Sequence, residues 1–168
     1  MNLEPEAHAA LRSLAERLLR GERRDHTLSA TDLTHEAWLR LAGTVAPGGA
    51  VSIAAAPDRL LLAARVMRQV LVDHARRRAT AKRRPAEGSR ALDPEQVAVE
   101  RDAYVVALDE ALRELATLDP ELAAVVDLRF FGGLGIDEVG SALALSPRTV
   151  KRRFALAKAW LHREIAAP

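Results

Sequence analysis

Two helices joined by a tight turn are predicted by residues 135–165, GIDEVGSALALSPRTVKRRFALAKAWLHREI. Ser146 can cap the unpaired N–H groups of the second helix, and Pro147 is tolerated at its first position. Beyond this start, apolar residues recur at helical spacing and form one stripe, made of Val150, Phe154, Ala157 and Leu161. The stretch therefore predicts a helix-turn-helix whose last helix buries one face.

The opposite face of that last helix is basic. From Pro147 onward the only acidic residue up to position 165 is Glu164, and four cations lie off the apolar stripe, namely Arg148, Lys151, Arg152 and Lys158. A short helix with a buried face and a basic N-terminal half has the shape that enters a DNA major groove. The alternative is a solvated amphipathic helix whose cations serve solubility.

The composition favours an all-α protein of one domain or two small ones. Of the 168 residues, 49% are hydrophobic, which suffices for a core, and the alternating β-branched runs of sheet proteins are missing. The chain has no Cys, which excludes a disulfide scaffold and a Cys-based zinc site and fits a reducing cytoplasm. No apolar run reaches membrane-spanning length and no signal peptide opens the chain, so we expect a cytoplasmic protein without a membrane partner.

Charge is distributed in blocks along the chain, although the net charge is only +2. Residues 65–90 are strongly basic, residues 93–121 are acidic, and basic residues prevail again from Arg129 onward. Two basic segments separated by an acidic one indicate two nucleic-acid contacts on one polypeptide. Ordinary charge variation along a helical protein is the alternative.

Three helices are predicted in the N-terminal half. The first covers residues 4–20, and the second starts at a cap provided by Ser29 or Thr31. The inner face of the second helix is formed by Leu33, Ala37, Trp38 and Leu41. After a loop rich in Gly, Ala and Pro (residues 43–57), the third helix runs over residues 58–84. Its inner face is formed by Ala63, Met67, Val70, Leu71 and His74.

The C-terminal half begins after a linker. Residues 85–94, PAEGSRALDP, hold the breakers and small polar residues that are typical of linkers. The next helix is paced by Tyr104, Leu108, Leu112 and Leu115. Asp119 and Pro120 then form a cap-plus-proline start, and that helix ends at Gly132 and Gly133, which suit a left-handed backbone.

Three stretches of the chain resemble the sigma-70 family of RNA polymerase sigma factors, in its extracytoplasmic-function (ECF) group. Residues 27–41, TLSATDLTHEAWLRL, resemble the helix of sigma domain 2 that docks on the polymerase clamp. Residues 63–83, AARVMRQVLVDHARRRATAKR, resemble the helix that reads and melts the −10 element. Residues 107–161 resemble sigma domain 4, which reads the −35 element. The three stretches occur in family order and cover most of the chain.

The resemblance implies two small helical bundles joined by a flexible linker. Sigma domain 2 would cover residues 1–84, the linker residues 85–103, and sigma domain 4 with its helix-turn-helix residues 104–168. Family members have a further helix ahead of the first one seen here, so we expect domain 2 to be incomplete or the true start to lie upstream. By resemblance, the acidic linker region lies near the template-strand path of polymerase. A simple tether followed by a solvated helix is the alternative.

Each matching stretch assigns binding roles to residues of this chain. By resemblance, the outer face of the second helix binds polymerase through Asp32, His35, Glu36, Leu39 and Arg40. The third helix would contact the −10 element through Arg65, Arg68, Arg76, Arg77 and Arg78, the last three mainly at phosphates. Recognition of the −35 element falls on Ser146, Arg148, Thr149, Lys151, Arg152 and Arg153, since Arg and Lys pair with the acceptors of guanine.

Two residues of the helix-turn-helix depart from the family pattern. Ala144 stands where the turn commonly has Gly, and a positive φ there would cost on the order of 1 kcal/mol. Gly140 lies inside the preceding helix, where Ala is usual and is expected to be more stabilising.

The function implied by the resemblance is that of a sigma factor, which binds core RNA polymerase and directs it to promoter DNA. An anti-sigma factor is a further potential partner. No enzyme activity, catalytic residue, cofactor or metal ion is expected, because the pair Asp73 and His74 is accompanied by neither a nucleophile nor a Gly-rich loop. The alternative is a stand-alone helix-turn-helix regulator, which would bind symmetrical half-sites as a dimer without polymerase.

Overall fold

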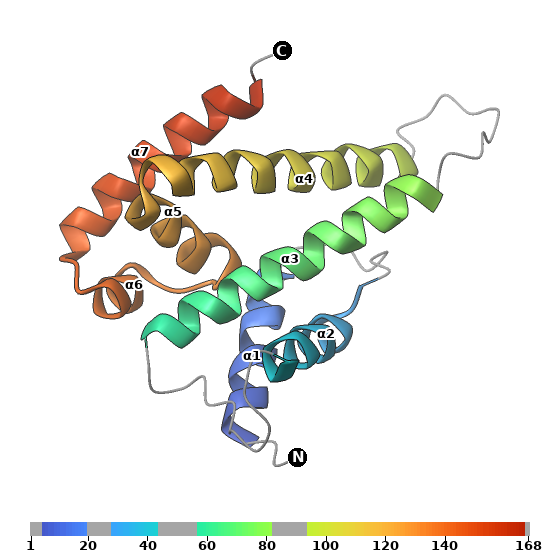
Figure 1. Cartoon of the computed structure of the whole chain (residues 1–168), viewed down its shortest axis with the longest axis horizontal. Coiled ribbons are helices and arrows are strands. Elements are labelled where there is room, and N and C mark those ends of the chain that lie inside the picture. Colours follow the sequence, from blue (N-terminus) through green and yellow to red (C-terminus); the bar gives the residue numbers. More distant parts are fainter. Residues whose placement is uncertain (1–4, 20–27, 44–56, 82–93, 167–168) are drawn as a thin grey trace.

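The computed structural model describes residues 5–19, 28–43, 57–81 and 94–166. These residues form seven α-helices and one π-helical turn, and no strand occurs among them (Figure 1). The prediction of an all-α protein is thus confirmed. In chain order the elements are α1 (Pro5–Leu18), α2 (Ala30–Gly43), α3 (Pro57–Ala81), α4 (Pro94–Leu118), α5 (Pro120–Val126), η1 (Asp127–Phe131), α6 (Ile136–Leu143) and α7 (Pro147–Ala166).

The cap of α2 is Ser29 rather than Thr31. The Ser29 hydroxyl accepts a hydrogen bond from the Asp32 backbone N–H at 3.1 Å, and the Asp32 carboxylate accepts from the Ser29 backbone N–H at 3.0 Å. This reciprocal pair satisfies two donors that a helix start leaves unpaired. The predicted inner face of α2 is confirmed, since it is buried at Leu33, Ala37, Trp38 and Leu41.

The long helix α3 presents its predicted inner face to the core. Ala63, Met67 and Val70 are fully buried, while Leu71 and His74 are partly buried beside a cavity. The loop predicted between α2 and α3 lies outside the described residues, except that Gly43 ends α2 and Pro57 begins α3.

The helix α4 begins earlier than predicted. Residues 94–103, which the domain division implied by the resemblance assigned to the linker, form its first turns, and residues 82–93 lie outside the described part of the chain. Leu108, Leu112 and Leu115 are buried as predicted, but Tyr104 is exposed. An apolar stripe in the sequence can be longer than the part of the helix that neighbouring helices cover. Periodicity alone therefore did not predict that Tyr104 is exposed.

The next helix starts and stops at the predicted residues. The Asp119 carboxylate accepts a hydrogen bond from the Leu122 N–H at 2.8 Å, and Pro120 occupies the first turn. The helix widens into the π-turn η1, which was not predicted. It ends at Gly132 and Gly133, and Gly133 has the left-handed φ of 60° that favours glycine.

The turn between α6 and α7 depends on two residues. Ala144 has φ 53° and ψ 40°, so this residue adopts the positive φ whose cost the sequence analysis considered. The expectation that Ala suits position 140 is wrong, because a Cβ on Gly140 would lie 2.7 Å from the Leu145 carbonyl oxygen. Gly140 therefore allows the turn to close against α6, where the Leu145 N–H donates to the Gly140 carbonyl at 2.8 Å.

Both halves of the chain contribute to one hydrophobic core. Its buried residues extend from Ala7 on α1 to Leu161 on α7. Figure 1 shows α3 lying alongside α4, and the ion pairs Arg78–Asp102 and Arg68–Asp109 show that the two helices are antiparallel. The two predicted bundles are therefore packed against each other in this structure.

Candidate nucleic-acid and polymerase interfaces

The N-terminal half of α7 presents a small cationic surface. The Ser146 hydroxyl accepts from the Thr149 N–H at 3.2 Å and also lies 2.8 Å from the Thr149 hydroxyl, which fixes the helix start. Three side chains that were predicted to read the −35 element are exposed in the next turn and a half, and these are Arg148, Lys151 and Arg152. Their common placement follows from helical geometry, because residues three and four apart share a face.

The other face of α7 is anchored to the C-terminal half. Val150, Ala157 and Leu161 are buried. The guanidinium of Arg129 lies 5.3 Å from the centre of the Phe154 ring, a distance suited to a cation–π contact. These contacts hold the apolar face of α7 against the core and η1, so its cations point away from the core.

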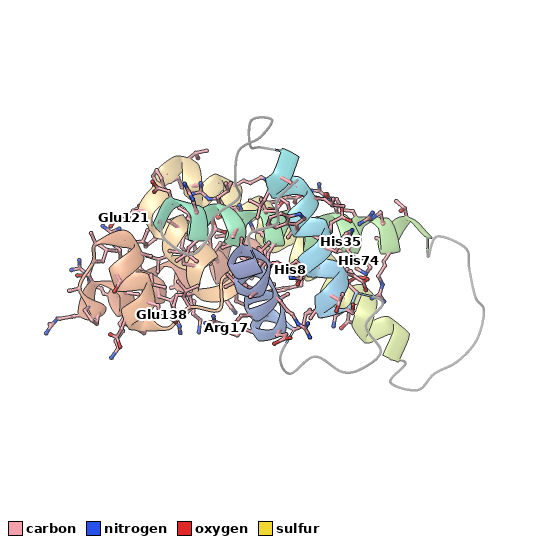
Figure 2. The ribbon with its side chains drawn as sticks, turned by 90° about the horizontal axis from the view of Figure 1, so that it is seen from below. His8, Arg17, His35, His74, Glu121 and Glu138 are labelled. Atoms are coloured by element: carbon pink, nitrogen blue, oxygen red, sulfur yellow. The ribbon has the colours of Figure 1, made fainter. Side chains whose placement is uncertain are left out.

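Arg153, which was predicted to contact DNA, is paired with two carboxylates of the same chain. Its guanidinium pairs with the Glu121 carboxylate at 2.9 Å and lies 3.5 Å from the Asp119 carboxylate, on the cap of α5. Glu121 belongs to the first turn of α5 and is labelled in Figure 2. Both carboxylates hold the partly buried Arg153 toward α5, whereas Arg148, Lys151 and Arg152 are exposed.

The five arginines predicted to contact the −10 element lie along α3. Arg76 and Arg77 are exposed near its C-terminal end, Arg65 and Arg78 are partly buried, and Arg68 is only 9% exposed. Most of them face carboxylates of α4 and η1. Arg76 lies 3.7 Å from Glu110, Arg78 lies 3.3 Å from Asp102, and the remaining contacts form a buried cluster.

This cluster, which we call the ionic cluster, consists of Arg65, Arg68, Asp109 and Asp127. The Asp127 carboxylate lies 3.2 Å from Arg65 Nε and 3.4 Å from Arg68 Nε, and Arg68 Nε lies 3.6 Å from Asp109. Burial raises the pKa of Asp127 despite the attraction of Arg68 and Arg65, and nearby Asp109 raises it further. Several buried nitrogen and oxygen atoms of the cluster make no hydrogen bond in the described structure. The cluster thus holds charges of both signs in imperfect geometry.

The outer face of α2 combines charged groups with one exposed apolar side chain. Leu39 is 55% exposed, and His35 and Asp32 are exposed beside it (His35 is labelled in Figure 2). The Arg40 guanidinium donates to Glu36 at 2.9 Å and to Asp73 of α3 at 2.8 Å, so it ties the helix to its neighbour. The Ser29 hydrogen bonds hold the pKa of the Asp32 carboxyl below its usual value.

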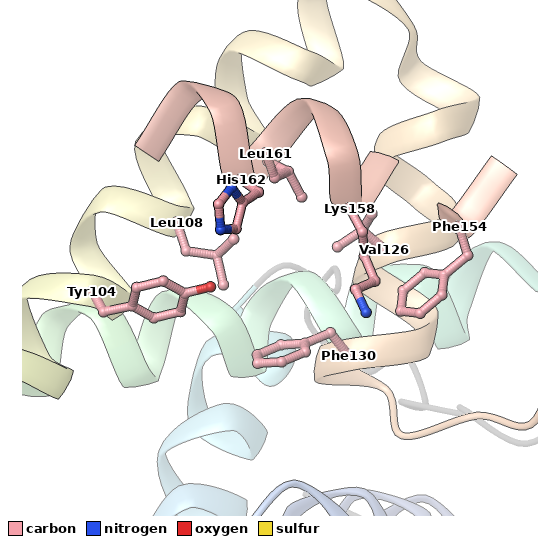
Figure 3. A pocket seen from close by; sticks show the side chains of 8 residues that line it. All are labelled: Tyr104, Leu108, Val126, Phe130, Phe154, Lys158, Leu161 and His162. Carbon is pink, nitrogen blue, oxygen red and sulfur yellow. The ribbon is translucent and has the colours of Figure 1, made fainter. Parts of the chain in front are cut away.

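An apolar cavity of about 280 Å³ lies behind α7. Figure 3 shows its lining, in which Tyr104 and Phe130 come from α4 and η1 and Phe154, Lys158 and His162 come from α7. Tyr104 and Phe130 are both about half exposed, and they also line a second cavity between the two halves of the chain.

Sequence reasoning missed the acidic partners of the α3 arginines. Asp102 and Asp109 lie in the acidic block at residues 93–121, which was interpreted as a polymerase-facing linker or a solvated helix. The complementary charges of the neighbouring basic block were the available signal. Nothing in the sequence pointed to Asp127, because it is a lone acid within an apolar helix.

The fold and the cationic surface define the chain as a DNA-binding protein of the helix-turn-helix class. The family model described as ECF sigma factor matches residues 2–167, and the chain belongs to this family. Its members are regulatory proteins, not enzymes, that direct RNA polymerase to promoters. No curated protein and no solved structure matches the chain. Among the described residues, no helix is both long and apolar enough to cross a membrane.

Proposed function

We propose that this chain directs core RNA polymerase to a promoter whose −35 element is read by α7. The observation that carries this proposal is the exposed trio Arg148, Lys151 and Arg152 on the N-terminal half of a helix whose opposite face is buried. In a helix-turn-helix, this half of the second helix contacts base edges in the major groove. Thr149, held by the Ser146 cap, is positioned for a phosphate.

A second DNA contact, to the −10 element, is assigned to α3. Arg76 and Arg77 are exposed at its C-terminal end, where they supply positive charge to phosphates. Arg65, Arg68 and Arg78 extend the same helix toward its middle. In this division, residues 1–84 act as sigma domain 2, and the sigma domain 4 unit begins within α4.

The polymerase contact is assigned to the outer face of α2. An exposed Leu39 among Asp32, His35 and the Glu36–Arg40 pair provides one apolar anchor within a polar rim. Such an arrangement is common at protein interfaces, where a few anchors supply most of the binding energy. The link from Arg40 to Asp73 would keep this face in register with α3.

Run-off transcription tests the proposal. The purified chain is added to core RNA polymerase on genomic DNA fragments, and discrete transcripts are expected whose start sites share upstream sequence elements. The double variant Arg148→Ala/Lys151→Ala serves as the matched control and should lose these transcripts. Binding to a symmetrical site without polymerase, together with no transcript, would instead identify a stand-alone regulator.

A further inference from the structure

The cavity behind α7 belongs to the C-terminal half of the chain alone. Its volume is about 280 Å³, and its lining residues come from α4, α5, η1 and α7. The exposed cations Arg148, Lys151 and Arg152 do not line it, so it is separate from the surface that we assign to the −35 element. Because several of its lining side chains are exposed, the cavity is open to solvent and a ligand can enter it.

Three aromatic and three aliphatic side chains form most of the lining (Figure 3). The aromatic ones are Tyr104 on α4, Phe130 on η1 and Phe154 on α7, and the first two are 52% and 49% exposed. Leu108 and Leu161 are buried, so they form the inner wall. Aromatic rings prefer offset-stacked or edge-to-face contacts with another ring, which add to the gain from covering apolar area. The lining therefore favours a flat aromatic ligand.

Two basic side chains add positive charge to this apolar lining. Lys158 and His162 lie one turn apart on α7, and both are exposed. Figure 3 shows the Lys158 side chain extending toward Phe130 and Phe154. Among the described residues, no carboxylate pairs with Lys158 or His162, and no acidic residue lines the cavity. A cation without a partner beside an apolar surface favours an anionic group of the ligand.

The volume of the cavity limits the size of this anion. Ligand sites commonly measure about 300–1,000 Å³, so a cavity of about 280 Å³ suits a compound of one or two rings. We infer that the cavity binds a small aromatic carboxylate. Its ring packs among Tyr104, Phe130 and Phe154, and its carboxylate accepts hydrogen bonds from Lys158 and His162. This ligand-binding activity goes beyond the proposed function and does not depend on it.

Isothermal titration calorimetry of the full chain with naphthoate tests the inference. A dissociation constant of about 1 mM or tighter is expected for a two-ring acid. Naphthamide has the same rings without the charge and should bind about tenfold more weakly. Decanoate, an aliphatic acid of similar size, should also bind more weakly, because it has no ring to stack. The inference is overturned if naphthoate does not bind, or if either comparison compound binds as tightly.

Lys158→Met tests the cation, because Met keeps most of the apolar stem and removes the charge. Its affinity for naphthoate should fall about tenfold, while its affinity for naphthamide stays unchanged. The matched control is Arg163→Met, which removes a cation at an exposed position of α7 outside the cavity lining. This control should bind naphthoate as the wild type does. An equal loss in both variants would mean a general attraction to positive charge and would contradict the site.

Phe130→Leu tests the aromatic wall. Because Phe130 is about half exposed, this variant should stay folded, which circular dichroism checks. Its affinity for naphthoate should fall roughly two- to tenfold, and its affinity for decanoate should not change. If the variant is unfolded, Tyr104→Leu replaces it at a similarly exposed ring. Unchanged naphthoate affinity in the folded variant would show that the ring does not contact the probe, against the inference.

Proton NMR identifies which cavity the probe enters. His162 lines the cavity behind α7, whereas His74 lines the second cavity, between the two halves of the chain. The ring current of bound naphthoate should shift the imidazole protons of His162 and leave those of His74 in place. The variants His162→Gln and His74→Gln assign the two sets of signals. A shift at His74 without one at His162 would place the probe in the second cavity and overturn the inference.

Discussion

At the scale of single residues, Ala144 is the clearest site of backbone strain in the helix-turn-helix. Its φ of 53° lies in the left-handed region, which a Cβ disfavours and Gly tolerates. Ala144→Gly should therefore raise the free energy of unfolding by about 1 kcal/mol. Urea denaturation followed by circular dichroism measures the change, and a lower stability of the variant would contradict the assignment of strain.

Gly140 should show the opposite response to a change of side chain. Helix propensity alone predicts that Gly140→Ala stabilises α6 by about 1 kcal/mol. The Cβ would lie 2.7 Å from the Leu145 carbonyl oxygen, so the turn must shift and the variant should be less stable than the wild type. The same urea experiment decides between the two effects.

Arg148 and Lys151 should determine sequence choice at the −35 element. They are one helical turn apart and both exposed, so they project together from the start of α7. If one bonds a guanine edge, its replacement by Ala should cost about 1–3 kcal/mol on the cognate sequence. The loss should be much smaller on a promoter already mutated at the contacted base pair, as measured by holoenzyme binding.

Val150→Asp is the contrasting variant for this prediction. Val150 is fully buried, so a carboxylate there should unfold the C-terminal helices rather than alter their specificity. Native transcription by both Arg148→Ala and Lys151→Ala would reject the assignment of α7 to the −35 element.

Asp127 should make stability depend on pH. Its pKa is raised by burial, against the attraction of Arg68 and Arg65 and with the added repulsion of Asp109. The folded chain therefore binds this proton more tightly than the unfolded chain, and the contribution to stability is lost as pH rises through the raised pKa. Compared with Asp127→Asn, which cannot titrate, the wild type should gain stability between about pH 7 and about pH 4, the ordinary pKa of an Asp carboxyl. Urea midpoints at both pH values measure this difference.

At the scale of elements, the C-terminal end of α3 should behave as a general phosphate contact. Replacing Arg76, Arg77 and Arg78 with Ala should weaken holoenzyme binding to all promoters alike and make its salt dependence shallower. Binding measured over a salt series on two different promoters tests both parts. A changed promoter preference with an unaltered salt slope would place these side chains on base edges instead.

The elements themselves were largely predictable from local chemistry. Ser146 and Asp119 cap the helices that they were predicted to cap, and Gly133 adopts the predicted left-handed backbone. The π-turn after Val126 was not predictable, because it depends on tertiary packing and leaves the apolar pattern unchanged. The start of α4 at Pro94 was not predicted, because the helix-breaking residues that precede it were interpreted as part of a longer linker.

The exposure of a candidate site residue was predictable where it depends on the geometry of one helix, and was not predictable where it depends on contacts between two helices. The exposed trio on α7 follows from the period of a single helix. Arg68 and Arg153 were predicted to face DNA, but each is held by carboxylates on another helix. Ion pairs between distant segments cannot be read from helical periodicity, since many partners satisfy the same charge pattern.

At the scale of the whole molecule, the shared core predicts that the two halves unfold together. Trp38 lies on α2 and Trp160 on α7, and they are the only two Trp residues of the chain. With the variants Trp38→Phe and Trp160→Phe, the remaining Trp reports on one half at a time, and the urea midpoints should coincide. In Asp102→Asn/Asp109→Asn the midpoints should separate, because the contact between the halves is weakened.

The ionic cluster also has a consequence for how sequences of this kind can diverge. Arg68 and Asp109 lie 3.6 Å apart in a buried setting, so a change at either position alone unbalances the charges of the ionic cluster. Substitutions at the two positions should therefore be inherited as pairs among related chains, for instance as a joint change to apolar residues. Arg77, which is exposed, should be substituted without a coupled change at another position. Covariation between α3 and α4 would then record the packing of these two helices in the evolutionary history of the family.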